Sequence, residues 1–156
     1  MSAILFDPTV QGLCWFWSRL RVPEVIWDEL LVRHDEQIGY QEFLAVLLGL
    51  STWDLSKSIV SVFIDNIGVQ CAIMRGSSSL PEINIAVGKL HFVNASLNRG
   101  VWTIRVESKA NIADGPTRDD FTFINECGAA WCHPRLPAWA YDVWLWPESF
   151  DSRWML

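Results

Sequence analysis

One segment in the second half of the chain constrains the fold most, because it joins a strand pattern directly to a turn that carries a carboxylate. Residues 101–107 alternate between apolar and polar side chains, which predicts a strand. The polar turn that follows carries Asp114, and Gly115-Pro116 behind it favours an abrupt change of direction into a helix. An aspartate at this position either caps the helix or, given suitable partners, binds a metal ion.

A second carboxylate follows another expected strand. Residues 59–64 are nearly all apolar and rich in β-branched side chains, which predicts a central strand covered on both faces. Asp65 and Asn66 come directly after this strand. A charged group at the end of a buried strand would lie at the rim of the sheet, where α/β proteins place their ligands.

A third carboxylate lies in an expected helix over residues 40–53, which is apolar almost all round and should therefore pack on a sheet. One face of this helix carries Glu42 together with Val46, Gly49 and Trp53. A charged glutamate on the packed side would be costly without a metal ion or a compensating charge. The alternative is a solvent-exposed glutamate near the helix start, where the helix dipole favours it.

The order of these features resembles the ribonuclease H-like domain of retroelement reverse transcriptases, most closely that of DIRS-like retrotransposons. The matching pieces are residues 37–45, 63–66 and 108–118, and the resemblance covers roughly residues 3–118. In order, they are a glutamate on a helix, Asp-Asn after an apolar strand, and Lys-x-Asn-x-x-Asp after a later strand.

The resemblance implies a function and a set of site residues. Glu42, Asp65 and Asp114 would be the catalytic residues and would bind Mg²⁺ or Mn²⁺, two ions in the intact domain. The domain would hydrolyse the RNA strand of RNA–DNA hybrids, inside a polyprotein that also contains the reverse transcriptase and other modules. Arg105 and Lys109 are candidates for contacting nucleic-acid phosphates, although ordinary surface charge also explains them.

The beginning of the chain departs from the family pattern. The family's first strand carries a further aspartate, whereas this chain opens with residues 3–6, a turn at Asp7-Pro8 and a second strand pattern over residues 13–17. These pieces resemble the family's second and third strands, so we expect the first strand and its aspartate to be absent. We interpret Asp7 as a turn residue, and we expect this fragment to be weakly active or inactive.

The expected fold is α/β, with a ribonuclease H-like mixed sheet flanked by helices, an antiparallel hairpin at its start and its N-terminal strand missing. Further helices are expected over residues 23–31, over residues 66–75 and from Pro81 onward. We expect the ribonuclease H-like domain to cover residues 1–120. Residues 121–156 would then form a C-terminal extension rich in Trp and Pro.

Composition limits the possible partners and compartments. The net charge of −6 argues against a strong general nucleic-acid binder. The sequence shows no signal peptide and no apolar run of membrane-spanning length, so we expect no membrane partner and an intracellular protein of the cytoplasm or nucleus that is not secreted. The four scattered cysteines agree with a reducing compartment.

The remaining candidate ligands give weaker signals, and two other functions are compatible with the sequence. Cys127, Cys132 and His133 offer only three ligands at a spacing that fits no closed zinc site, and His91 is interpreted as structural or exposed. The main rival function is a catalytically inactive retroelement remnant that serves as a structural or protein-interaction module. An α/β domain unrelated to nucleases is the other, and it requires the three carboxylates to lie far apart.

Overall fold

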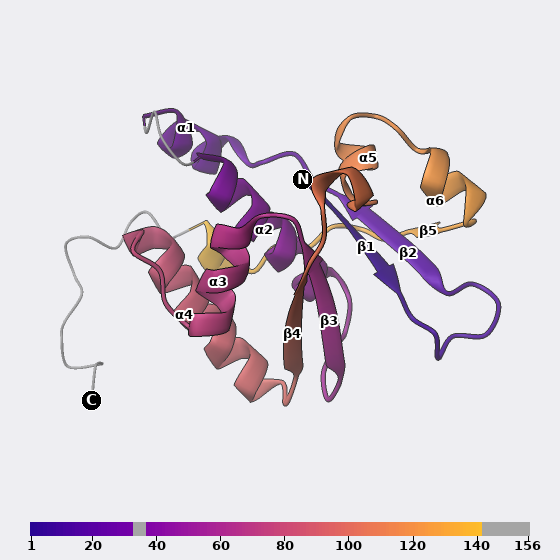
Figure 1. Ribbon diagram of the computed structural model, residues 1–156, viewed down its shortest axis with the longest axis horizontal. Coiled ribbons are helices and arrows are strands. Elements are labelled where there is room, and N and C mark those ends of the chain that lie inside the picture. Colours follow the sequence, from indigo (N-terminus) through magenta and orange to yellow (C-terminus); the bar gives the residue numbers. More distant parts are fainter. Residues whose placement is uncertain (33–36, 142–156) are drawn as a thin grey trace.

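The structure, a computed structural model, describes residues 1–32 and 37–141 and has a mixed α/β architecture (Figure 1). The main elements are β1 (Ser2–Phe6), β2 (Trp15–Arg19), α1 (Glu24–Val32), α2 (Gln37–Thr52), β3 (Ile59–Ile64), α3 (Ile67–Arg75), α4 (Pro81–Ser96) and β4 (Gly100–Arg105). Short elements follow, namely η1 (Ser108–Ala110), α5 (Asp114–Thr117), α6 (Thr122–Glu126), β5 (Ala130–Trp131) and η2 (Ala138–Ala140). The predicted α/β class is therefore confirmed.

The first sheet contains the predicted hairpin. Strand β1 pairs antiparallel with β2, with Ala3 opposite Ser18, and β5 adds to β2 in parallel. The Asp7 carboxylate organises the hairpin turn, because its Oδ1 accepts hydrogen bonds from the backbone N–H of Thr9 at 2.9 Å and from the Thr9 hydroxyl at 2.6 Å. The interpretation of Asp7 as a turn residue is confirmed.

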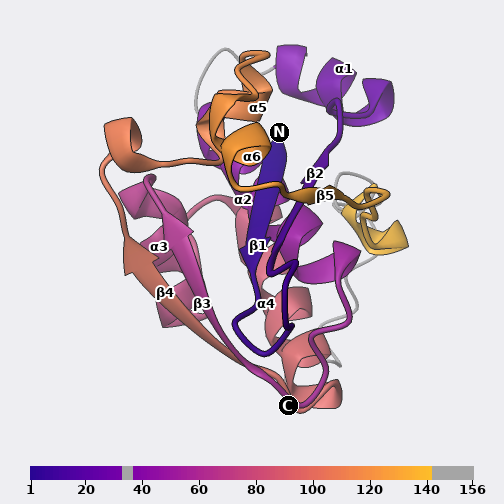
Figure 2. The ribbon, with the colours of Figure 1, turned by 90° about the vertical axis from the view of Figure 1, so that its right-hand side faces the viewer.

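The second sheet consists of β3 and β4, which pair in parallel with Val62 opposite Thr103. No ladder of hydrogen bonds joins this sheet to the first one within the part of the chain that the structure describes. Both views place β1 and β3 next to each other as the facing strands of the two sheets (Figures 1 and 2). The single mixed sheet that we expected is therefore divided between β1 and β3.

The prediction that residues 59–64 form a central strand covered on both faces is wrong. Ile59 is 89% exposed and Phe63 61% exposed, and Trp102 of β4, on the same face, is 69% exposed. Helices pack on the opposite face, where Val60 and Val62 are half-buried. Among the described residues, β3 has one hydrogen-bonded neighbouring strand and no element over its outer face. Its apolar residues therefore alternate between the core and an exposed surface.

Helix α2 forms the centre of the core, as its apolar sequence predicts. Phe43, Leu44, Leu47 and Leu48 are each at most 1% exposed. The predicted stripe faces the first sheet, because a Cβ placed on Gly49 would lie 3.4 Å from the Cβ of Ala3 in β1. Glu42 is therefore on the packed side of the helix, two turns before Gly49.

Helices α3 and α4 follow their sequence signals closely. The side chain of Asn66 caps α3 by accepting a hydrogen bond from the backbone N–H of Val69, and Gly76 ends the helix in the left-handed conformation with φ of 71°. Pro81 occupies the first position of α4. None of the described helices is long and apolar enough to span a membrane.

The chain after β4 crosses to the first sheet, where α6 and β5 lie beside β2 (Figure 2). Its aromatic side chains pack against those of β2. The rings of Phe123 and Trp15 are 5.2 Å apart, and those of Phe121 and Trp17 are 5.6 Å apart. We call β1, β2 and β5 the covered sheet and β3 with β4 the open sheet. The turn at residues 34–36 and the tail at residues 142–156, with Trp144, Trp146 and Trp154, lie outside the described residues.

Candidate metal centre

Three separate elements supply the predicted carboxylates. Glu42 lies in the second turn of α2, Asp65 follows the last residue of β3, and Asp114 is the first residue of α5. The hydroxyl of Ser2 donates a hydrogen bond to the backbone carbonyl of Ala113, which ties the turn before Asp114 to the start of β1. Figure 1 shows α5 beside this N-terminal end of the sheet.

The three carboxylates are close enough to change one another's ionisation. The pKa of Glu42 is raised to about 7, mainly by burial and further by the negative charges of Asp65 and Asp114 and a side-chain hydrogen bond with Asp65. Burial also raises the pKa of Asp114, the charge of Asp65 adds to that rise, and the Arg118 guanidinium opposes it. The structure therefore brings Glu42, Asp65 and Asp114 together into one electrostatically coupled cluster, despite their separation in sequence.

One atom of this cluster lacks a partner. Oε2 of Glu42 is buried and has no hydrogen-bond partner among the described residues. Buried polar atoms in native proteins are nearly always satisfied, so an orphaned carboxylate oxygen indicates a missing proton donor or cation. Carboxylates are also the ligands that hard divalent cations such as Mg²⁺ prefer.

Asn66 also belongs to the cluster through a side-chain hydrogen bond with Glu42, a role that the sequence interpretation did not assign to it. Its Oδ1 accepts a hydrogen bond from the Val69 backbone N–H at 3.1 Å, while its side chain opposes the rise in the pKa of Glu42. A Cβ on Gly68 would lie 3.1 Å from that Oδ1, so glycine at this position leaves room for the Asn66 side chain. The signal in the sequence was the Asp-Asn pair directly before a helix.

The turn that carries Asp114 is built from its own motif. The Asn111 side-chain amide donates to Oδ1 of Asp114 at 3.4 Å, and Oδ1 of Asn111 accepts from the Ala113 backbone N–H at 3.2 Å. A Cβ on Gly115 would lie 2.9 Å from the carbonyl oxygen of Asp120, so this position requires glycine. The Asn-x-x-Asp-Gly pattern therefore has a structural basis in the described turn.

The side chains do not form a closed metal site as they stand. Among the described residues, no group of three His, Cys, Asp or Glu side chains is arranged to hold a metal ion. The cluster is thus an electrostatic one, in which Glu42 and Asp65 share a hydrogen bond and the charges of the carboxylates raise one another's pKa. Arg105, at the end of β4, and Lys109, in η1, are both exposed on the segment that leads to Asp114.

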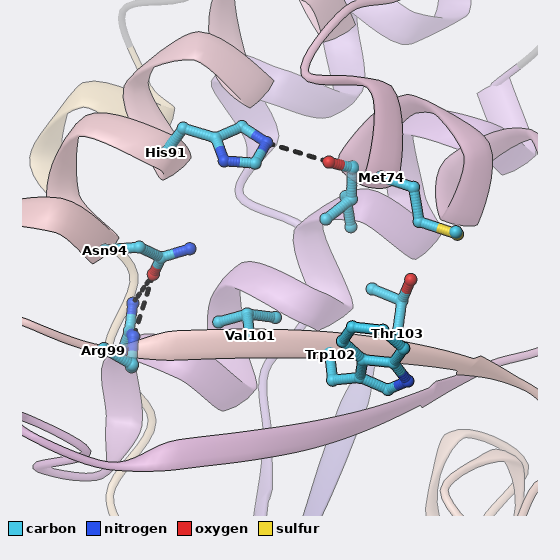
Figure 3. Close-up of a pocket in the computed structure, with 8 residues that line it drawn as sticks. Met74, His91, Asn94, Arg99, Val101, Trp102 and Thr103 are labelled. Carbon is cyan, nitrogen blue, oxygen red and sulfur yellow. Dashed lines mark hydrogen bonds between the residues drawn. The ribbon is translucent and has the colours of Figure 1, made fainter.

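A cavity of about 250 Å³ lies away from the carboxylates, between α3, α4 and the edge of β4 (Figure 3). Two of its polar side chains have structural partners. His91 Nε2 lies 2.8 Å from the carbonyl oxygen of Ile73, and the Arg99 guanidinium donates to the Asn94 side chain and to the carbonyl of Leu50. Arg99 thereby ties the end of α2 to α4. None of the three carboxylates lines this cavity, so it is not part of the metal centre.

Comparisons with family models, with curated proteins and with solved structures find no match for this chain.

Proposed function

We propose that this chain is a metal-dependent ribonuclease H-like domain of a retroelement reverse transcriptase, with Glu42, Asp65 and Asp114 as its metal ligands. The observation that carries the proposal is the buried, unpartnered Oε2 of Glu42, beside two further carboxylates that raise its pKa. A divalent cation would supply the missing partner of Oε2. It would also remove the repulsion among the three carboxylates.

The bound ions, Mg²⁺ or Mn²⁺ and two of them in the intact domain, would activate water and stabilise the leaving oxygen during phosphodiester hydrolysis. The protein's own residues have simpler tasks. Glu42, Asp65 and Asp114 hold the ions, and Asn66 keeps its amide beside Glu42. Arg105 and Lys109 contact the backbone phosphates of an RNA–DNA hybrid. This chemistry needs no nucleophilic side chain.

The arrangement of the carboxylates bears on the expected activity. A metal ion would have to reorient the three side chains, since no three described ligands are arranged to hold it beforehand. Two-metal hydrolysis depends on accurate positioning, so a site that must first close is a poor catalyst. The resemblance implies a further aspartate on a first strand, and we propose weak or no hydrolysis by these 156 residues alone.

The metal site can be tested through stability. Mn²⁺ at about 100 times its Kd should stabilise the fold by about 2.7 kcal/mol, which raises Tm by roughly 5–10 °C. Asp65→Asn should lose most of this gain and should be at least as stable as wild type without metal, because one repelling charge is gone. Asp54→Asn is the matched control, since Asp54 is exposed beyond the far end of α2 and its Oδ1 only accepts hydrogen bonds from Ser56. Equal Mn²⁺ shifts for wild type and Asp65→Asn would rule out the site.

A second candidate is a catalytically inactive, retroelement-derived module that binds protein. The open sheet favours it, because Ile59, Phe63 and Trp102 present a large exposed apolar face. Such faces on soluble domains commonly mark interaction sites. The same titration separates the two functions, because an inactive module has no reason to retain metal-dependent stabilisation through Asp65. Both candidates suit an intracellular protein whose partners are the reverse transcriptase and other modules of a polyprotein.

A further inference from the structure

Arg118 is placed one turn after Asp114 and pairs with it directly. Its Nη2 lies 3.4 Å from Oδ2 of Asp114, and the Arg118 side chain is 78% exposed while that of Asp114 is 35% exposed. The other oxygen of Asp114 accepts from the Asn111 amide, also at 3.4 Å. Both contacts are at the long end of hydrogen-bond distances, so Asp114 is held loosely and can exchange partners.

The positive charge of Arg118 acts directly on one of the three carboxylates, that of Asp114. Of the residues whose side chains are described, Arg118 is the only one that forms an ion pair with any of the three carboxylates. It is also the group that opposes the rise in the pKa of Asp114. Arg118 therefore supplies part of the positive charge that a metal ion would otherwise supply.

We propose that Arg118 is a transferable cation, which pairs with Asp114 in the metal-free site and binds a substrate phosphate once a divalent ion occupies the site. This inference rests on the proposed function. A metal ion on Asp114 repels the guanidinium, whereas a phosphate bound at the metal attracts it. Guanidinium groups match phosphate oxygens with two parallel hydrogen bonds, and an exposed ion pair is weak enough to be exchanged.

In the Arg118→Ala variant, the affinities for Mn²⁺ and for the RNA–DNA hybrid should change in opposite directions. Arg118→Ala removes a cation that competes with the metal, so the Kd for Mn²⁺ alone should fall by about 2–5-fold. The same variant loses a phosphate contact, so the Kd for an RNA–DNA hybrid at saturating Mn²⁺ should rise several-fold. The slope of log Kd against log salt should also decrease by about 1. A purely structural role for Arg118 would weaken both interactions or neither.

Two further variants control for charge and folding. Arg135→Ala removes the same charge at an exposed residue away from the cluster. The backbone N–H of Arg135 donates to the hydroxyl of Thr52, which lies ten residues, or about 15 Å, along α2 from Glu42. This variant should leave the Mn²⁺ Kd unchanged. Arg118→Lys retains the charge without the planar fork, so it should bind Mn²⁺ like wild type and the hybrid with intermediate affinity.

The measurements are Mn²⁺ titration by calorimetry and anisotropy of a fluorescein-labelled RNA–DNA hybrid at several salt concentrations. Tighter Mn²⁺ binding together with weaker hybrid binding in Arg118→Ala supports the proposal. If wild type binds Mn²⁺ but Arg118→Ala matches Arg135→Ala in both assays, or binds Mn²⁺ more weakly, the proposal is wrong while the metal site stands. A wild type that binds no Mn²⁺ overturns both.

Discussion

The covered sheet and the open sheet each carry a tryptophan on the outer face, yet among the described residues only the covered sheet has other rings packed over it. In the covered sheet, Trp17 of β2 is half-buried and contacts the rings of Phe121 and Trp131. In the open sheet, Trp102 of β4 is largely exposed. The difference comes from the path of the chain after β4, which crosses to the covered sheet and, up to residue 141, places no element over the outer face of β3 and β4.

The three carboxylates lie on elements of both sheets and on the segment between them. Asp65 ends a strand of the open sheet, and Asp114 begins the helix of the segment that crosses to the covered sheet. Glu42 comes from the helix whose stripe packs on β1. The candidate metal centre therefore lies at the boundary between two sheets that are not hydrogen bonded to each other. The geometry of this boundary should decide the activity.

The largest change in hydrolytic activity should come from adding a strand that joins the two sheets. We expect an N-terminal extension with one alternating, aspartate-bearing strand to pair between β1 and β3 and to increase Mg²⁺-dependent cleavage of RNA–DNA hybrids by at least about 100-fold, since positioning errors of 1 Å can cost that much. The same extension with Asn in place of Asp is the control for added stability alone. Asp114→Asn in the extended protein should abolish the gain.

The result for the unextended chain is equally informative. Robust metal-dependent cleavage by residues 1–156 alone would contradict the expectation of weak activity. Asp7 would then be the first residue to re-examine, even though its carboxylate organises the hairpin turn.

Two tryptophan substitutions compare the sheets directly. Trp17→Ala should destabilise the protein by about 3 kcal/mol, because it opens a cavity among packed rings. Trp102→Ala should change the free energy of unfolding by less than about 1 kcal/mol and should increase solubility, because it removes exposed apolar surface. Urea denaturation of both variants provides the measurement. A large loss in Trp102→Ala would mean that the outer face of the open sheet is covered in solution.

The boundary cluster should make stability depend on pH. The pKa of Glu42 in the folded state, about 7, lies above the value of about 4.5 expected when unfolded, so the unfolded state loses its proton first. Stability should therefore fall as pH rises from about 5 to 8 without metal, by about 1–2 kcal/mol after allowing for solvent screening. Glu42→Gln should flatten this profile and be more stable than wild type at pH 8. Parallel profiles for the two proteins in urea denaturation at pH 5 and pH 8 would contradict the coupling.

Local signals in the sequence located the elements well. Asn66 and Gly76 delimit α3, Pro81 begins α4, and Asp7 forms the hairpin turn, because caps and turns depend on residues that are close in sequence. The stripe of α2 also predicted the packed position of Glu42.

What the sequence could not predict depends on distant partners. The run at residues 59–64 could not distinguish a strand covered on both faces from one with an exposed apolar face, since both are rich in Val, Ile and Phe. The crossing of residues 108–131 to the covered sheet is set by contacts such as Phe123 with Trp15, more than a hundred residues apart. The effects of Asn66 on Glu42 and of Asp65 on Asp114 likewise depend on contacts between elements that are far apart in the sequence.

The smallest change in the free energy of unfolding is expected at the ion pair that links β2 to the segment after β4. Arg19 Nη1 lies 2.6 Å from Oδ1 of Asp119, and the Arg19 guanidinium also lies 6.0 Å from the centre of the Phe121 ring. Asp119 has a φ of 62°, which Asn tolerates as well as Asp, so Asp119→Asn removes the charge without adding backbone strain. We expect a loss of about 0.2–1 kcal/mol at low salt that vanishes in 1 M NaCl, because the pair is exposed and screened. A loss that persists in 1 M NaCl would show that Asp119 stabilises the covered sheet through an interaction that salt does not screen, such as hydrogen bonding or packing, and not through the charge of an exposed ion pair.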